Sequence, residues 1–294
     1  MKTIRDAKFV PEWMDMEPMI PEPKIDWIEK KYLDIAYGDD PLQKLDLYYP
    51  DADNPVPLVV VIHGGGWCCC DKRDWHLYPG FYALKKGFAV ASVNYRLSPA
   101  VQFPKPLEDV KAAIMYLRDH AGELGIRKED IFLYGTSAGG NLAALAGLQN
   151  AGTEYAVSAV AALCPLIDFE NQLKYWEIYS PLAAEYVTVS RSQLADYLGS
   201  DAEQDPAVLR AAGTKMHITK DAPPFYIQHG TLDPAVPFIQ SCHFAKQLRE
   251  VCKEEQVVLD ILENTGHAGG GPEFLEAEHI TPILEFFLKY CSNV

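Results

Sequence analysis

One serine of this chain has the surroundings of a nucleophile. Ser137 lies at the centre of the segment Gly135–Gly139, which reads Gly-Thr-Ser-Ala-Gly. The apolar run Asp130–Tyr134 before it is typical of a buried strand, and the Ala- and Leu-rich stretch after it is typical of a helix. A sharp strand-to-helix turn holds a serine hydroxyl clear of the sheet, beside helix amides that favour developing negative charge. The pattern predicts that Ser137 is a nucleophile; the alternative is a glycine-rich turn with an incidental serine.

A serine hydroxyl needs a base to take its proton, and a histidine base needs an acid to fix its tautomer. Asp233 and His267 can supply these groups, because each follows a predicted strand, as Ser137 does. The acid has rivals in Asp260 and Glu263, but both are too close to His267 in sequence to face it easily. We therefore predict nucleophilic catalysis by Ser137, with His267 as the base and Asp233 as the acid.

Eight histidines compete for the role of base. Only His267 combines the chain order serine, acid, histidine with a position in a loop of small residues that leaves its ring mobile. His63 lies in a glycine turn, which we expect it to brace, and His229 ends a predicted strand. The others fall on predicted helices or in the long segment 166–222: His76, His120, His217, His243 and His279.

Strands that alternate with helices must position these side chains. The β-branched run Pro57–Ile62 is typical of a central parallel strand that is covered on both faces. The other predicted strands are 45–49, 88–95, 130–134, 156–163, 224–230 and 256–262, and the predicted helices are 106–124, 141–148, 236–251 and 274–290. This alternation predicts an α/β protein with a mostly parallel central sheet and helices on both faces, which binds ligands at the carboxyl ends of its strands.

The alternation is interrupted once, and this defines the predicted domain organisation. We expect an N-terminal arm over residues 1–30 and one core formed by residues 31–165 and 223–294. Residues 166–222 are rich in aromatic residues and contain no clear strand, so we predict a helical cap inserted over the carboxyl-end edge of the sheet. The candidates for lining the substrate pocket are Trp67, Tyr175 and Trp176.

Composition excludes several classes of partner. The 294 residues include 41 acidic and 26 basic side chains, a net charge of −15 that argues against nucleic acid and anionic membranes as partners. The seven cysteines include the adjacent Cys68–Cys70, which rarely reach one tetrahedral metal together, so we expect reduced thiols and no metal site. No apolar run is long enough to span a membrane. We expect a cytoplasmic protein, with secretion after removal of a signal peptide as the alternative, and a homodimer as the candidate assembly.

Five motifs together resemble the carboxylesterase and acetylesterase branch of the α/β-hydrolases, close to the hormone-sensitive-lipase-like and BD-FAE-like esterases. They are His63-Gly-Gly-Gly-Trp67, Asn94-Tyr-Arg-Leu97, Gly135-Thr-Ser-Ala-Gly-Gly140, His229-Gly-Thr-Leu-Asp-Pro-Ala-Val-Pro237 and Gly266-His267. The resemblance implies the α/β-hydrolase fold, the same serine, acid and histidine, and no cofactor. It also implies an oxyanion hole formed by backbone N–H groups of Gly65, Gly66 and Ala138. The sequence departs from the family pattern at Cys68–Cys70 and at Gly269–Gly271, which are unusual there.

These observations predict a serine esterase. We expect it to hydrolyse short-chain carboxylic esters, such as acetyl esters of sugars or other small alcohols, through an acyl-enzyme. One alternative is an amide or formamide hydrolase that resembles arylformamidases, which share the H-G-G-x-W turn. A second alternative is a ligand-binding member of the fold that has lost catalysis, and the complete set of serine, acid and histidine argues against it.

Overall fold

The computed structural model describes residues 20–179, 184–199, 205–267 and 273–292. Most of the predicted N-terminal arm, residues 1–19, lies outside the described residues, as does the unusual glycine run 269–271. The division into arm, core and cap therefore stays a prediction.

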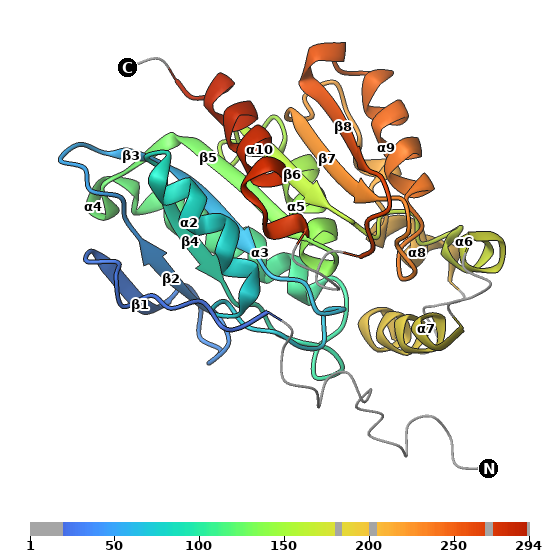
Figure 1. The fold of residues 1–294 in the computed structure, drawn as a ribbon. Coiled ribbons are helices and arrows are strands. Elements are labelled where there is room, and N and C mark those ends of the chain that lie inside the picture. Colours follow the sequence, from blue (N-terminus) through green and yellow to red (C-terminus); the bar gives the residue numbers. More distant parts are fainter. Residues whose placement is uncertain (1–19, 180–183, 200–204, 268–272, 293–294) are drawn as a thin grey trace.

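The core is one eight-stranded sheet in the order β1-β2-β4-β3-β5-β6-β7-β8 (Figure 1). The strands are β1 (Lys31–Ala36), β2 (Lys44–Tyr48), β3 (Val56–Ile62), β4 (Ala89–Val93), β5 (Ile126–Thr136), β6 (Ala159–Leu163), β7 (Phe225–Gly230) and β8 (Val257–Leu262). Strand β2 is antiparallel to both of its neighbours, and all other pairs are parallel. The predicted mostly parallel sheet is confirmed.

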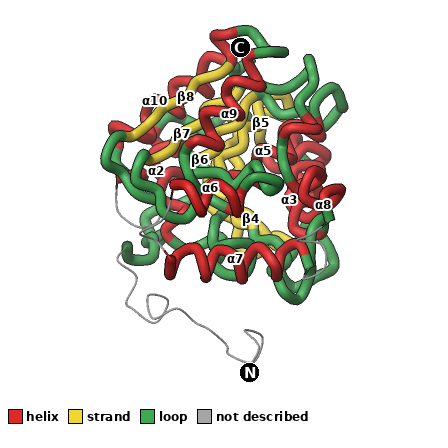
Figure 2. The backbone as a smooth tube through the Cα atoms, turned by 90° about the vertical axis from the view of Figure 1, so that its right-hand side faces the viewer, coloured by secondary structure: helices red, strands yellow, loops and turns green. Residues whose placement is uncertain are grey.

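Helices cover both faces of this sheet (Figures 1 and 2). They are α2 (Tyr78–Lys85), α3 (Lys105–Asp119), α4 (Ala121–Leu124), α5 (Ala138–Asn150), α6 (Gln172–Tyr179), α7 (Ala184–Leu198), α8 (Pro206–Ala212), α9 (Ile239–Arg249) and α10 (Ala277–Lys289). Side chains of α3, α5 and α9 share one apolar cluster, and those of α2 and α10 share the other. In β3, Leu58, Val60 and Ile62 belong to the first cluster, whereas Val59 and Val61 belong to the second. This explains the continuous apolar run, since a strand between two helical layers buries both of its faces.

Two helix boundaries differ from the prediction. The helix expected over 106–124 is two helices, because the backbone leaves the helical region at His120 and the second helix ends at Gly125 with φ +65°. The helix expected from Val236 begins only at Ile239. The backbone N–H of Val236 is instead bound by the side chain of Asp233, so it belongs to the turn before the helix.

The segment between β6 and β7 carries α6, α7 and α8. Helix α6 contacts the loop after β7 through Trp176, and α7 contacts the loop after β3 through Gln193. These helices therefore lie at the carboxyl-end edge of the sheet (Figure 2), the edge where parallel sheets bind ligands.

Candidate active site

Ser137 occupies a strained turn between β5 and α5. Its φ of +57° and ψ of −119° are unfavourable for any residue with a side chain. The flanking glycines are required by close backbone contacts. A Cβ on Gly135 would lie 2.2 Å from the carbonyl oxygen of Gly139, and a Cβ on Gly139 would lie 2.2 Å from that of Ile62. The G-x-S-x-G spacing therefore follows from the packing of the helix against the ends of two strands.

The structure brings the three predicted side chains into one hydrogen-bonded chain. His267 Nε2 lies 2.8 Å from Ser137 Oγ, and His267 Nδ1 lies 2.6 Å from Asp233 Oδ2. A carboxylate only accepts, so Nδ1 carries the hydrogen and Nε2 of the neutral ring accepts from the serine hydroxyl. Burial alone would raise the pKa of Asp233. The positive charge that His267 carries when it is protonated, and the hydrogen bonds of His229 and His267, outweigh that effect and hold the pKa of Asp233 well below its usual range.

The turn after β7 fixes the carboxylate of Asp233. Its Oδ1 accepts hydrogen bonds from the backbone N–H groups of Ala235, at 2.9 Å, and of Val236, at 2.8 Å. The rival acid Asp260 is occupied elsewhere, because it accepts hydrogen bonds from Tyr226 Oη and Gln228 Nε2, both at 2.9 Å.

A second histidine contacts the same carboxylate. His229 is fully buried, and its Nε2 lies 3.0 Å from Asp233 Oδ2 and 2.8 Å from the carbonyl oxygen of Val236. Both partners accept, so Nε2 carries a hydrogen, and Nδ1 of the neutral ring accepts from Ser241 Oγ at 2.7 Å. From the sequence alone, His229 is only a rival base. The available signal was its position four residues before Asp233 at the end of a strand.

The glycine turn after β3 presents free backbone amides beside Ser137. Gly65 and Gly66 have φ of +90° and +57°, and the carbonyl oxygen of Gly65 accepts from the amides of Cys68 and Cys69. Within the described residues, no group accepts a hydrogen bond from the backbone N–H of Gly65, Gly66 or Ala138. These three amides are the donors that the family resemblance implies, and their role stays a prediction.

His63 and Tyr95 hold the backbone of this turn in place. The Tyr95 hydroxyl donates to the carbonyl oxygens of His63, at 3.0 Å, and of Gly64, at 3.2 Å. The ring of His63 stacks on Tyr95 with centroids 4.4 Å apart. Burial lowers the pKa of His63 to about 4, so this ring is neutral and donates from Nδ1 to the Gly64 carbonyl. This contact fits the bracing role expected for His63.

The pocket candidates lie in three different environments. Trp67 is buried and stacks on Tyr197 with centroids 4.1 Å apart. Trp176 is also buried, and its Nε1 donates to the carbonyl oxygen of Ala235 at 2.7 Å, which braces the acid turn. Tyr175 is hydrogen-bonded to Asp168 at 3.0 Å and lines a cavity of about 430 Å³. Ser137 and its two partners do not line that cavity, and contact of any of these aromatic residues with substrate stays a prediction.

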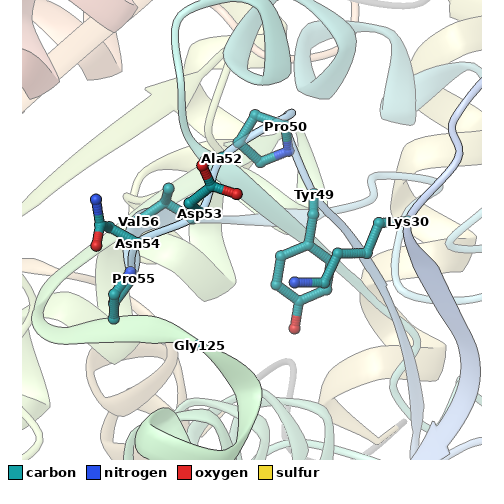
Figure 3. A pocket seen from close by; sticks show the side chains of 9 residues that line it. All are labelled: Lys30, Tyr49, Pro50, Ala52, Asp53, Asn54, Pro55, Val56 and Gly125. Carbon is teal, nitrogen blue, oxygen red and sulfur yellow. The ribbon is translucent and has the colours of Figure 1, made fainter.

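Another cavity, of about 190 Å³, lies away from these groups (Figure 3). Val56 and Gly125 line it, at the beginnings of β3 and β5. Lys30 and Tyr49 also line it, and Lys30 Nζ lies over the ring of Tyr49, 4.3 Å from the centroid. The catalytic candidates follow the opposite ends of the strands, so this cavity is separate from them. Among the described helices, none is both long and apolar enough to cross a membrane.

Two curated proteins with esterase names are similar to this chain. The chain is 28% identical over 281 residues to Esterase LipC of Mycobacterium tuberculosis, a match that covers 88% of this chain and 64% of LipC. It is 30% identical over 268 residues to the probable carboxylic ester hydrolase LipM of the same organism, covering 87% of this chain and 60% of LipM. The chain thus spans less than two thirds of the length of these relatives.

Solved structures share the fold. A truncated form of a carbohydrate esterase from gut microbiota superposes with a TM-score of 0.77 at 22% identity, covering 92% of this chain and 99% of that one. With the sheet order above, this likeness shows the α/β-hydrolase fold. The BD-FAE family model matches residues 45–248, which include the glycine turn, Ser137 and Asp233. The chain therefore belongs to the BD-FAE family.

Proposed function

We propose that this protein is a serine esterase that hydrolyses short-chain carboxylic esters through an acyl-enzyme. The observation that carries the proposal is the hydrogen-bonded chain from Ser137 through His267 to Asp233, with distances of 2.8 and 2.6 Å. The esterase names of LipC and LipM support the same reaction class.

In the first half of the reaction, Ser137 Oγ attacks the carbonyl carbon of the ester. His267 Nε2 takes the hydroxyl proton as the bond forms, and then gives it to the oxygen of the leaving alcohol. Asp233 keeps the ring in the tautomer that can accept this proton and stabilises the imidazolium. The attack forms a tetrahedral oxyanion. Its breakdown gives the acyl-enzyme and the free alcohol.

The free amides beside Ser137 face the charge that develops on the carbonyl oxygen. Gly65, Gly66 and Ala138 supply these N–H groups, and removal of one such donor typically lowers kcat by about 10²–10³. In the second half, water takes the place of the alcohol. His267 removes a proton from the water, which attacks the acyl carbon, and the proton returns to Ser137 Oγ as the carboxylic acid leaves.

Gln193 is the feature that favours a short acyl group. Its side chain packs against the glycine turn, since a Cβ on Gly66 would lie 2.3 Å from Gln193 Cδ. Trp67, the residue after Gly66, packs in an aromatic cluster with Tyr197 and Phe169. We expect a polar side chain at the glycine turn to disfavour a long apolar acyl chain there.

The test compares purified protein with Ser137→Ala. We expect hydrolysis of p-nitrophenyl acetate and of acetylated sugars, a decline in kcat/KM with acyl length, and covalent labelling by a fluorophosphonate. The Ser137→Ala protein should show neither hydrolysis nor labelling. An N-formyl arylamide measures the alternative reaction, and preference for it over the ester would contradict the proposal. Folded protein that resists labelling would support a binding role instead.

A further inference from the structure

We propose that Cys70, Asp74 and His76 form a binding site for a thiophilic divalent cation of the zinc type, next to the glycine turn. This site goes beyond the proposed esterase reaction. Three adjacent cysteines alone rarely form a metal site, but the fold brings two other donor types to one of them.

The geometry of the donors carries the proposal. One ligand atom from each of Cys70, Asp74 and His76 lies within 4.8 Å of the other two. The Sγ atoms of Cys69 and Cys70 are 4.0 Å apart, so a second thiol lies beside the group. Cys70 is exposed, so a cation can reach the cluster from solvent, whereas His76 is buried and held in place.

Local structure orients the imidazole for coordination. Asp74 caps the short helix η2 (Trp75–Leu77) and accepts from both the backbone N–H and the Nδ1 of His76, at 2.9 and 2.7 Å. Nδ1 therefore carries the hydrogen, and within the described part of the chain no group hydrogen-bonds to Nε2. A cation that takes the place of this hydrogen is bound by both Nδ1 and the Asp74 carboxylate, and the ring hydrogen moves to Nε2, which has no partner to lose.

The donor set selects the class of cation. Thiolate, imidazole and carboxylate together suit zinc and its heavier relatives, whereas magnesium and calcium prefer oxygen donors alone. Three protein ligands leave a fourth position for water or for the Cys69 thiol. Binding releases the Cys70 thiol proton to solvent, because the thiolate is the ligand. The net charge of −15 favours the approach of a cation.

Occupation of this site should disturb the glycine turn. A Cβ on Gly64 would lie 2.9 Å from His76 Nε2 and 3.3 Å from the Cβ of Ser137, and a Cβ on Gly65 would lie 2.7 Å from Cys70 Sγ. The imidazole and the thiol thus pack directly against the backbone that leads to the predicted oxyanion donors. We expect a bound cation to inhibit the enzyme, and this consequence alone rests on the proposed function.

Cadmium is the probe, because its bond to a thiolate absorbs in the ultraviolet whether or not the protein has enzymatic activity. Titration of the full chain should give a saturable thiolate-to-cadmium band at one equivalent, and zinc should displace it. Cys70→Ser, an exposed change, should weaken binding at least tenfold, and Asp74→Asn should weaken it less. Cys242→Ser is the matched control and should bind like the unchanged protein.

Three outcomes would refute this site: no saturable band, a band unchanged by Cys70→Ser, or an equal loss of cadmium binding in Cys70→Ser and Cys242→Ser. Circular dichroism of each variant separates lost binding from lost folding. A parallel assay with p-nitrophenyl acetate should show inhibition by zinc that a chelator reverses. If the protein hydrolyses no ester, the cadmium band still decides the metal site.

Discussion

Replacement of Asp233 by asparagine tests the proposed mechanism most directly, because the structure fixes which way the amide must face. Ala235 and Val236 both donate backbone N–H groups to Oδ1, so the amide oxygen must take that position. The NH₂ group then occupies the place of Oδ2 and faces His267. Since an NH₂ group donates, His267 must accept at Nδ1 and carry its hydrogen on Nε2.

That tautomer cannot accept the proton of Ser137. An enzyme with the same arrangement of groups loses about 10⁴ in kcat after the equivalent change, or about 5.5 kcal/mol of transition-state stabilisation. His229 adds to the effect, because its Nε2 already donates to the Val236 carbonyl and cannot accept from the new NH₂. We therefore expect Asp233→Asn to lower kcat for p-nitrophenyl acetate by about 10⁴, with a smaller change in KM.

Asp260→Asn is the matched control. Asp260 is a partly buried carboxylate with two side-chain donors, and it is the acid that sequence reasoning weighed against Asp233. We expect the kcat of the Asp260→Asn variant to stay within about threefold of that of the unchanged protein, because the change lies outside the reacting groups. Thermal unfolding verifies that both variants fold. Folded Asp233→Asn protein with kcat within tenfold of the original would refute the tautomer argument.

Three further predictions concern the glycine turn. His63 takes up a proton below pH 6.5 in the unfolded chain but only below about pH 4 in the folded protein. The free energy of unfolding should therefore fall by about 3 kcal/mol as pH drops through that window. In urea unfolding, His63→Gln should lose most of this pH dependence. Gly125→Ala imposes a φ of +65° on alanine and should cost about 1–2 kcal/mol in thermal unfolding; Gly66→Ala imposes +57° and also places its Cβ 2.3 Å from Gln193 Cδ, so it should cost at least as much, and only Gly66→Ala should lower kcat. Gln193→Ala should raise kcat/KM for butyrate relative to acetate esters, and an unchanged ratio would remove Gln193 as the length limit.

The sequence predicted the sheet well because its central strands are buried on both faces. The run Pro57–Ile62 is continuous and β-branched, and it overlaps β3 almost completely. Strand β1, Lys31–Ala36, was missed, because it is an edge strand whose side chains are mostly exposed and alternate weakly. The end of α3 at Asp119 was also missed, since the apolar spacing continues past His120 and only the backbone marks the break.

The site was predictable to the extent that strong local chemistry marks it. Ser137, Asp233 and His267 each follow a strand, and parallel strands bring their carboxyl ends to one edge. His229 and His76 were not assigned their partners, because a lone histidine in a sequence does not reveal what its second nitrogen contacts. Only the fold shows that one meets the acid and the other meets Asp74.

The segment between β6 and β7 supports both halves of the site by separate contacts. Trp176 of α6 holds the Ala235 carbonyl, two residues after the acid, and Ala235 in turn donates its N–H to Asp233. Tyr197 of α7 stacks on Trp67, which directly follows the glycine turn. A change in this segment that alters these contacts should therefore also move the carboxylate or the predicted oxyanion donors. Substrate range and turnover should be coupled in this protein, and variants of α6 and α7 should rarely alter KM without altering kcat.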